Sequence, residues 1–375
     1  MSSRYAHTAA KSTQQRYYTV ENAFNVKDDI SDLSFSYNNR YLAISSWDGS
    51  INVIEFSEDY GQAKSKFSRY MSTTTSSTYT MGTGTKIACI RCLFRPIDDV
   101  LYFTTSMGEI YSLDLAPATP NPTKVYGEPA NEPRRGPFVG LKWNESAQVF
   151  VALEITTAGT NAQNLGGSLF TLAQESSHRI DLDYKPIALD VSDKYVIVVG
   201  TKYGENCIWC YTLDGHIKNE TVKVEIKSQL KHQFTSIACG PILANTTRPS
   251  YIASTVFGQA DYNEGTENHD IINLHINATS KASFGSNSIA FVPGHKCAVS
   301  ASSDGTITFV NLETKRTKAF QISQQIPLTK LAVHPNGNVI AIASGYDWSL
   351  GYEMAGREKP PINLYIRQFN PSDYR

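Results

Sequence analysis

Residues 41–56 read YLAISSWDGSINVIEF. The stretch contains two short runs rich in aliphatic and aromatic residues, Tyr41–Ile44 and Ile51–Phe56. Several of these residues are β-branched, and such runs favour strands. Trp47-Asp-Gly49 lies between them and is a turn signal, because aspartate and glycine tolerate the backbone angles of tight hairpins. The stretch therefore predicts a β-hairpin.

The same pattern recurs along the chain, with seven copies in all. The second run of each copy follows a turn, and these runs are Ile51–Phe56, Ile110–Leu115, Ser168–Leu172, Cys207–Leu213, Ile271–Ile276, Thr306–Leu312 and Ile362–Gln368. A further strand precedes each hairpin, marked by an apolar residue before a turn: Phe35, Phe94, Trp143, Val191, Cys239, Phe291 and Val333. Successive markers lie roughly 42 to 59 residues apart, against about 40–45 residues for a WD-type propeller blade.

These repeats predict an all-β fold, a single seven-bladed WD-repeat β-propeller. A blade cannot bury both of its faces alone, so the ring is expected to fold as one unit. Arg16–Val20, or Asn22–Val26 just after it, would supply the outer strand of the last blade and close the ring. We expect residues 1–15 to form a disordered tail, residues 16–369 the propeller, and residues 370–375 a C-terminal tail. A transit peptide is the alternative interpretation of the N-terminus.

Composition excludes several classes of protein. The 375 residues carry a formal net charge of -1, which argues against general nucleic-acid binding because that needs a clustered Lys/Arg footprint. No apolar run approaches the length of a membrane-spanning helix, so we expect no membrane insertion.

Cys89-Ile-Arg-Cys92 and Cys207-Ile-Trp-Cys210 match a zinc-ligand spacing. Each pair lies within a predicted strand, where residues three apart point to opposite faces, so we interpret the cysteines as core or strand thiols and expect no metal. No catalytic set can be assembled from the sequence, and we expect neither an enzyme nor a cofactor. A propeller hydrolase is the alternative from another class of function.

Five segments make the chain resemble a known family. They are Asp29–Ser36, Ser45–Gly49, Ser228–Gln233, Asn287–Phe291 with Ser303–Gly305, and Tyr346–Gly351 with Ile366–Gln368. The chain is similar over roughly residues 20 to 368 to the WD-repeat messenger-RNA export factors of the nuclear pore, the Gle-two/Rae-one family. Spindle-checkpoint adaptors of Bub-three type are related and share most of these segments. The run Tyr346-Asp-Trp-Ser-Leu-Gly351 resembles the export branch.

The resemblance implies an adaptor without enzymatic activity. It also implies a location in the nucleus, at the nuclear pore complex and nuclear envelope, and partly in the cytoplasm. Such proteins hold a Glu-rich nucleoporin peptide of Gle-two-binding-sequence type, or a checkpoint kinase peptide, across one face of the ring. Contact with RNA beside the pore is also implied. Trp47 and Lys231 match family positions on the binding face.

The sequence departs from the family at two places where it commonly has arginine. Gln233 is followed by Phe234-Thr235-Ser236 rather than by Thr-Arg, and the Glu-Gly-Arg turn of the fifth blade is replaced by Phe257-Gly258-Gln259. Both arginines would pair with peptide carboxylates, which glutamine cannot replace. The acidic residues Asp261, Glu264, Glu267 and Asp270 are expected in the neighbouring loop, where they would repel an acidic peptide.

The turns between the second and third strands of every blade are expected on one rim, so Trp47, Lys231, Gln233, Gln259 and Trp348 should share a face and form the peptide-binding site. Three long segments, 158–167, 258–270 and 345–361, are expected as insertions in that turn. They either wall the binding face or reflect drift in tolerant loops. Trp47 could instead pack between blades, and Trp348 could instead tie its loop base by hydrogen bonds.

Overall fold

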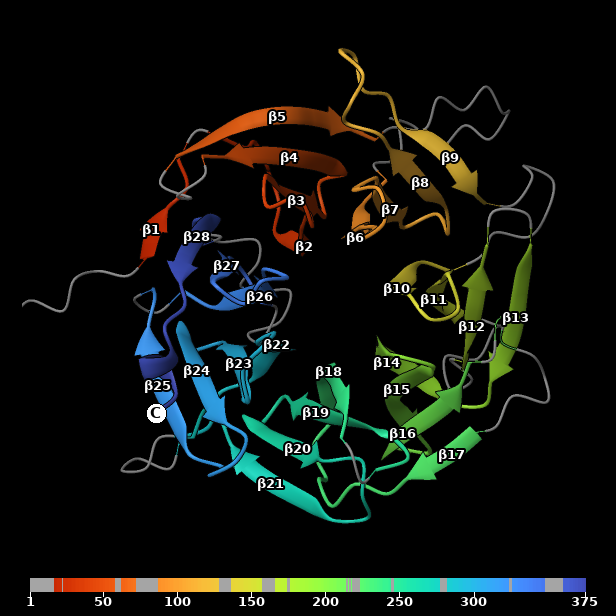
Figure 1. Cartoon of the computed structure of the whole chain (residues 1–375), viewed down its shortest axis with the longest axis vertical. Helices are drawn as coiled ribbons and strands as arrows, with labels where there is room; N and C mark the ends of the chain where they lie inside the picture. The colour runs from red at the N-terminus through yellow and green to blue at the C-terminus, as the bar shows by residue number, and fades with distance from the viewer. Residues whose placement is uncertain are drawn as a thin grey trace, which may run out of the picture.

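The chain forms a closed ring of blades around a central opening (Figure 1). The computed structural model describes residues 17–21, 23–57, 62–71, 87–127, 136–156, 166–173, 176–213, 215, 217, 223–243, 246–276, 282–323, 326–347 and 360–375. These residues form seven antiparallel four-stranded sheets, each with its strands in the order inner, second, third and outer. The prediction of an all-β, seven-bladed propeller is confirmed.

The first four blades follow the chain in order. Blade 1 comprises β2 (Ile30–Phe35), β3 (Tyr41–Ser46), β4 (Ser50–Phe56) and β5 (Ala63–Tyr70). Blade 2 comprises β6 (Cys89–Phe94), β7 (Leu101–Thr105), β8 (Ile110–Leu113) and β9 (Thr123–Tyr126). Blade 3 comprises β10 (Phe138–Asn144), β11 (Val149–Thr156), β12 (Gly166–Leu172) and β13 (Ser177–Leu182). Blade 4 comprises β14 (Lys185–Ser192), β15 (Tyr195–Lys202), β16 (Glu205–Thr212) and β17 (Lys223–Ile226).

The last three blades complete the ring. Blade 5 comprises β18 (Phe234–Ile242), β19 (Pro249–Thr255), β20 (Gln259–Asn263) and β21 (His269–Asn273). Blade 6 comprises β22 (Ser286–Phe291), β23 (Cys297–Ser302), β24 (Thr306–Asn311) and β25 (Thr317–Gln321). Blade 7 comprises β26 (Leu328–Val333), β27 (Val339–Ser344), β28 (Asn363–Gln368) and β1 (Tyr17–Thr19). A short 3-10 helix, η1 (Pro371–Asp373), follows β28.

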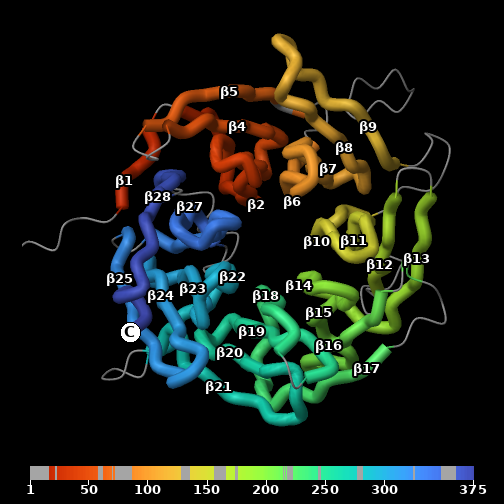
Figure 2. Tube along the Cα trace, viewed as in Figure 1, coloured from red at the N-terminus to blue at the C-terminus, as the bar shows by residue number. Residues whose placement is uncertain are grey.

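The N-terminal strand closes the ring, as the sequence predicted. β1 pairs antiparallel with β28, with Tyr18 opposite Ile366, so the first strand of the chain is the outer strand of the last blade (Figure 2). This pairing gives β28 a partner on its outer side and removes a free sheet edge. Residues 370–375, the expected C-terminal tail, include η1, and Phe369 and Tyr374 pack against the apolar cluster between blades 6 and 7.

The core is divided among the interfaces between blades. The described residues form seven apolar clusters, one between each pair of neighbouring blades. The cluster between blades 7 and 1, for example, joins Leu42 and Ile44 to Ala341 and Ile366, all of which are fully buried. Burial of this kind stabilises the ring only when both neighbours are in place.

One β-bulge recurs at the same place in the inner strand of every blade. A bulge adds one residue and shifts the faces to which the following side chains point. In β6 it lies between Cys89 and Arg91, so Cys89 and Cys92 pack in the same apolar cluster. The expectation that they point to opposite faces is therefore wrong. Cys207 and Cys210 belong to different clusters. Burial raises the pKa of Cys89 to about 12, so this thiol keeps its proton.

Blade 5 departs from the sequence prediction. The third strand is Gln259–Asn263, and His269–Asn273 is the outer strand, whereas Ile271–Ile276 was expected as the third strand. Residues 258–270 are therefore not an insertion in a turn. The acidic residues assigned to that loop lie elsewhere: Asp261 is buried in β20, and Lys315 binds Glu264 and Asp270 at 3.0 and 3.1 Å. Glu267, in the β20–β21 turn, lies 4.0 Å from Arg248. The expectation that these four acidic residues share a loop beside Gln259 is therefore wrong.

Candidate peptide-binding face

One rim of the propeller carries the turns between the second and third strands and the connections from each blade to the next. We call this rim the turn face. It includes residues 47–49, 203–204, 227–233, 256–258 and 303–305. The four site residues that the structure describes, Trp47, Lys231, Gln233 and Gln259, lie on or beside it. Trp348 and the inserted segments 157–165 and 348–359 lie outside the described residues.

Trp47 stands at the tip of the β3–β4 turn, and 48% of it is exposed. Its backbone N–H donates to the carbonyl of Asp29 at 3.1 Å. Asp48 accepts hydrogen bonds from the backbone of Ser50 and Lys27 at 2.7 and 2.5 Å, which fixes the turn. The indole is therefore presented to solvent by a rigid turn, which favours a role in binding over packing between blades.

The seventh-blade turn is joined to the same connection. The Tyr346 backbone N–H donates to the Asp29 carboxylate at 2.8 Å. Asp347 accepts from the side-chain amide of Asn287 at 3.3 Å. The base of the loop is thus tied through Tyr346 and Asp347, next to the turn that carries Trp47.

Lys231, His232 and Gln233 are exposed on the connection that enters blade 5. The Asn206 side chain donates to the carbonyls of Leu230 and His232 at 3.0 and 2.6 Å, and Leu230 is buried in the core. The Gln233 carbonyl accepts from the Val256 backbone at 3.0 Å, which joins the connection to the β19–β20 turn. The backbone of this segment is therefore fixed while its side chains face solvent.

An aromatic cluster adjoins this segment. The His232 imidazole stacks on the ring of Phe257, with centroids 4.2 Å apart and planes at 13°. Phe257 is 48% exposed, and Val256 and Phe284 beside the same turn are also exposed. Exposed apolar side chains gathered in one place often mark a protein-binding site. The sequence signal for this cluster is the apolar pair at 256–257, where the turns at 47–49 and 303–305 carry Asp before Gly.

Tyr203, at the neighbouring β15–β16 turn, is 96% exposed and has a positive φ of 54°. Such a conformation is uncommon for an aromatic residue. Tyr203 extends the run of exposed aromatic side chains on the turn face from blade 5 to blade 4. The sequence signal for it was the Tyr-Gly pair in a hairpin turn.

Gln259 lies at the start of β20, and its side-chain amide donates to Asn273 at 3.1 Å. This bond holds the amide against its own blade. The structure thus gathers Lys231, Gln233 and Gln259 around the entry to blade 5. Trp47, on blade 1, lies across the central opening from them (Figure 1). A ligand that contacts both groups must span this separation, either over the opening or along the rim.

A buried polar cluster beneath this region resembles a hydrolase triad in composition but not in arrangement. Ser228 donates to the Asp261 carboxylate at 2.5 Å, and His269 lies 2.8 Å from the other oxygen of the same carboxylate. A nucleophile needs a base within hydrogen-bond reach, yet both partners here bind the carboxylate rather than one another. Asp261 is fully buried, so the cluster ties the connection to blade 5. Among the described residues, no group of His, Cys, Asp and Glu could hold a metal ion.

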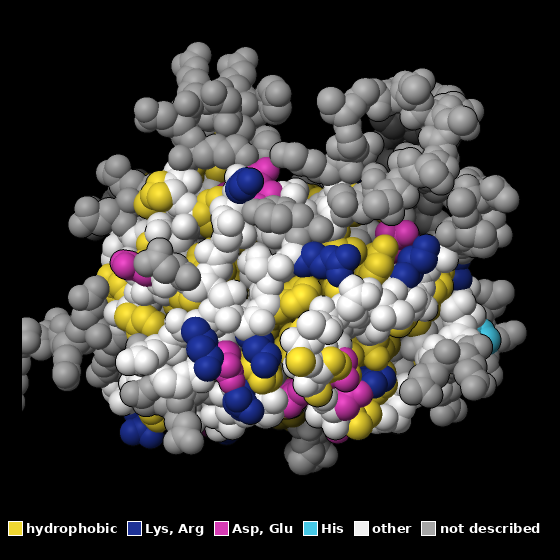
Figure 3. All heavy atoms as spheres, turned by 90° about the horizontal axis from the view of Figure 1, so that it is seen from above, with side chains coloured by type: hydrophobic (Ala, Val, Ile, Leu, Met, Phe, Trp, Pro, Cys, Tyr) yellow, Lys and Arg dark blue, Asp and Glu magenta, His cyan; other side chains and the backbone are white. Residues whose placement is uncertain are grey.

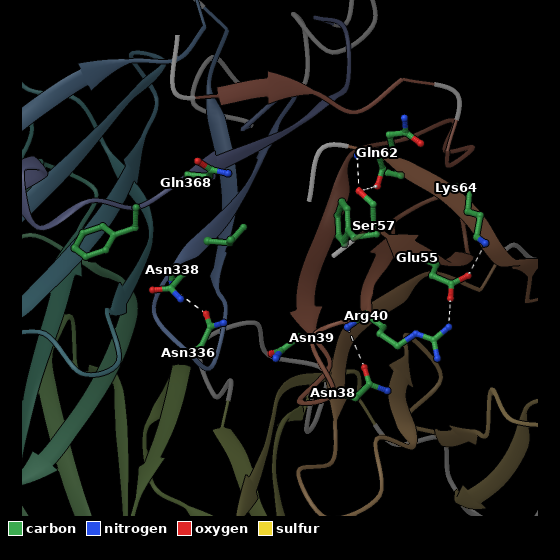
Figure 4. Close-up of a pocket in the computed structure, with 14 residues that line it drawn as sticks. Asn38, Asn39, Arg40, Glu55, Ser57, Gln62, Lys64, Asn336, Asn338 and Gln368 are labelled. Atoms are coloured by element: carbon green, nitrogen blue, oxygen red, sulfur yellow. Dashed lines mark hydrogen bonds and ion pairs between the residues drawn. The ribbon is translucent and has the colours of Figure 1, made fainter. Parts of the chain in front are cut away.

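The opposite rim carries a polar groove between blades 1 and 7 with a volume of about 1090 Å³ (Figure 4). Arg40 and Lys64 both bind Glu55, the latter at 3.2 Å, and Asn336 and Asn338 lie across the groove. Burial opposes ionisation of Glu55, but the hydrogen bonds from Arg40 and Lys64 outweigh it and lower the pKa of this carboxyl. The groove lies on the rim away from the turn face and does not contribute to the candidate site.

Basic side chains on the edge of the ring lie among acidic ones (Figure 3). Lys64 pairs with Glu55, Lys124 with Glu109 at 3.4 Å, and Arg95 with Asp98. Paired cations give a weaker electrostatic footprint for nucleic acid than a continuous basic stripe.

Comparison with known proteins agrees with this architecture. Residues 19–55, from the end of β1 to the end of β4, match the WD40 family, described as "WD domain, G-beta repeat". The first blade of this seven-bladed β-propeller therefore resembles a WD repeat. The chain is similar to the "Protein Rae1" of Drosophila melanogaster, with 35% identity over 81 residues that cover 22% of this chain and 23% of that protein.

Two vertebrate relatives carry the description "mRNA export factor". The Danio rerio protein is 37% identical over 84 residues, 22% of each chain, and the Mus musculus protein is 39% identical over 75 residues, 20% of each chain. The propeller therefore resembles the Rae1-type mRNA export factors. The matched region spans less than a quarter of these relatives' own length. Within the described ranges, no helix has the length and apolar character that crossing a membrane requires.

Proposed function

We propose that this WD-repeat propeller is a non-enzymatic adaptor in messenger-RNA export that binds a short, Glu-rich nucleoporin peptide across its turn face. The proposal places it in the nucleus at the nuclear pore complex and nuclear envelope, and partly in the cytoplasm. Two observations support it: the similarity to proteins named mRNA export factor, and the exposed lysine and aromatic side chains on the turn face.

The observation that carries the proposal is the grouping of an exposed lysine with an exposed aromatic pair. Lys231 makes no ion pair with any described residue, and His232 beside it stacks on Phe257. A lysine without a counterion can meet a glutamate of a peptide, and neighbouring aromatic rings can cover its apolar side chains. The acidic side chains expected in this region point elsewhere, so they do not oppose such a ligand.

Direct binding of a Glu-rich nucleoporin peptide tests the proposal. Fluorescence anisotropy with the full chain should give saturable binding that Trp47→Ala or Lys231→Ala weakens. Lys194→Ala is the matched control, because Lys194 is an exposed lysine in the β14–β15 turn of the opposite rim. If neither change on the turn face weakens binding, or if the control weakens it equally, the assignment of the face is wrong.

A spindle-checkpoint adaptor is the alternative, because most segments that resemble the export factors resemble that branch too. Affinity purification from native cells separates the two. Recovery of nucleoporins supports export, and recovery of checkpoint kinases without nucleoporins would replace the proposal. RNA bound together with the peptide partner is part of the export proposal, and crosslinking in the same cells would detect it.

A further inference from the structure

Charged side chains line the central channel, on the inner strands of five blades. They are Asp32 in blade 1, Arg91 in blade 2, Lys142 in blade 3, Asp190 in blade 4 and Lys330 in blade 7. Asp32, Arg91 and Lys330 each follow the recurrent bulge directly, so they occupy equivalent positions around the channel. The space they border has a volume of about 440 Å³.

The channel carries more positive than negative charge. Lys142 pairs with Asp190 at 2.9 Å across two blades. Arg91 is held by carbonyl groups instead: its Nε donates to Val139 at 2.7 Å and its Nη1 to Ser31 at 3.2 Å. Neither Arg91 nor Lys330 forms an ion pair with a described residue, whereas Asp32 is the one carboxylate left to offset them. Three cations therefore face two anions.

Lys330 is the least compensated of these groups. Burial, followed by the positive charge of Arg91, lowers the pKa of its ammonium to about 8, although the nearby Asp32 opposes the shift. A cation in such a position gains from an added anion, because an opposite charge restores the interactions that it lost with water.

Hydroxyl groups on the inner strands of blades 5 and 6 add neutral hydrogen-bond donors to the channel. Ser236 accepts a hydrogen bond from the Ile289 backbone, and Ser288 accepts one from the Leu331 backbone, each at 3.3 Å. A hydroxyl that accepts from a backbone N–H keeps its own proton for donation. The channel thus offers an ammonium, a guanidinium and hydroxyl donors, a set that suits a group with several oxygen atoms.

We propose that the central channel binds one phosphate group, as inorganic phosphate or as a small phosphate monoester, between Lys330 and Arg91. The charge of the phosphate offsets the excess positive charge of the channel wall, and its oxygens accept from the ammonium and the hydroxyls. This site lies inside the ring, away from Lys231 and Phe257, so it does not depend on the proposed peptide site.

The test measures phosphate binding by ³¹P NMR line broadening and by the rise in melting temperature at constant ionic strength. Inorganic phosphate and glycerol 3-phosphate are the two probes, with sodium chloride as the reference salt. Wild type is expected to bind at least one probe. A response to inorganic phosphate alone identifies the free ion as the ligand, and an equal or stronger response to the ester identifies a phosphorylated solute.

Lys330→Met is expected to weaken binding at least about tenfold, since it removes a charge-assisted hydrogen bond. The variant should fold, because replacing an unpaired, desolvated cation with an apolar side chain of similar length removes an unfavourable burial. Lys330→Arg should retain binding. Lys66→Met, an exposed lysine on the outer strand β5, is the matched control and should bind as wild type does. No binding of either probe to wild type, or equal binding to wild type and Lys330→Met, would overturn the proposal.

Discussion

The guanidinium of Arg367 and the carboxylate of Asp373 form an ion pair at 3.2 Å, with side chains only 4% and 1% exposed. Arg367 lies on β28, and Asp373 belongs to the 3-10 helix that follows it. The guanidinium also lies over the rings of Phe320 and Phe309, at 4.5 and 5.5 Å from their centroids. The charge pair therefore ties η1 to blade 7, and the contacts of Arg367 with Phe309 and Phe320 join blade 7 to blade 6.

Asp373→Asn should destabilise the ring strongly. The change removes the negative charge that faces the buried guanidinium of Arg367, and breaking a buried ion pair typically costs about 3–5 kcal/mol. Urea-induced unfolding followed by tryptophan fluorescence measures the change. Glu313→Gln is the matched control, because it breaks the pair with Lys296 at the surface and should leave the midpoint unchanged. Equal shifts for the two variants would contradict this account of Arg367.

Gly305→Ala should cost far more stability than Gly204→Ala. Each glycine ends the turn between the second and third strands of its blade, Gly305 in blade 6 and Gly204 in blade 4. Both have a positive φ, 80° and 84°, so the backbone penalty of about 1–2 kcal/mol is common to both. A Cβ at Gly305 would lie 2.4 Å from the carbonyl oxygen of Ser323, whereas a Cβ at Gly204 meets nothing within 4 Å. Urea unfolding of both variants isolates the cost of this overlap. Equal losses would show that the connection from blade 6 to blade 7 yields to the added methyl group.

The sequence was sufficient for the parts of the fold that depend on local patterns. Short β-branched runs and their turns predict the blade number, and the apolar markers from Phe35 to Val333 all lie in inner strands, as expected. The closing strand was predictable to within two candidate runs, Arg16–Val20 and Asn22–Val26, and the structure uses the first. The recurrent bulge was not, since nothing in a single inner strand shows where its partner skips a residue.

Blade 5 shows why other features escaped prediction. Gln259–Asn263 is polar and resembles a loop, whereas the buried Asp261 is stabilised by Ser228, 33 positions away. Only the folded chain reveals that a carboxylate in this strand has partners. The stack of His232 on Phe257 likewise joins residues from a connection and a turn, so periodicity within either segment could not indicate it.

Phe257→Ala should weaken binding of the proposed nucleoporin peptide about fivefold to thirtyfold, as expected when an interface side chain worth roughly 1–2 kcal/mol is lost. Its ring is exposed and held in place by His232, so truncation removes contact area without opening the core. Ile97→Ala is the matched control, because Ile97 is an exposed apolar residue in the β6–β7 turn of the opposite rim. Isothermal titration calorimetry of both variants measures the effect. Unchanged affinity in Phe257→Ala would remove the aromatic cluster from the site.

His275 should make the protein less stable as the pH falls. Burial lowers the pKa of its imidazole to about 4, against about 6.5 in an unfolded chain, and Ser300 and Thr308 bind the ring at 2.8 and 3.2 Å. Above pH 6.5 the ring is neutral in both states, so it has no effect. Between about pH 6.5 and 4 the unfolded chain binds a proton that the folded protein does not, and stability falls by up to about 3 kcal/mol. Urea unfolding at pH 7 and pH 4.5 should therefore show a larger loss of stability for wild type than for His275→Gln, which lacks this titration.

The pKa of His334 is also lowered by burial, but that residue is present in both proteins, so its contribution cancels in the comparison. Equal losses of stability in the two proteins would mean that the folded protein accommodates the protonated His275 ring without cost.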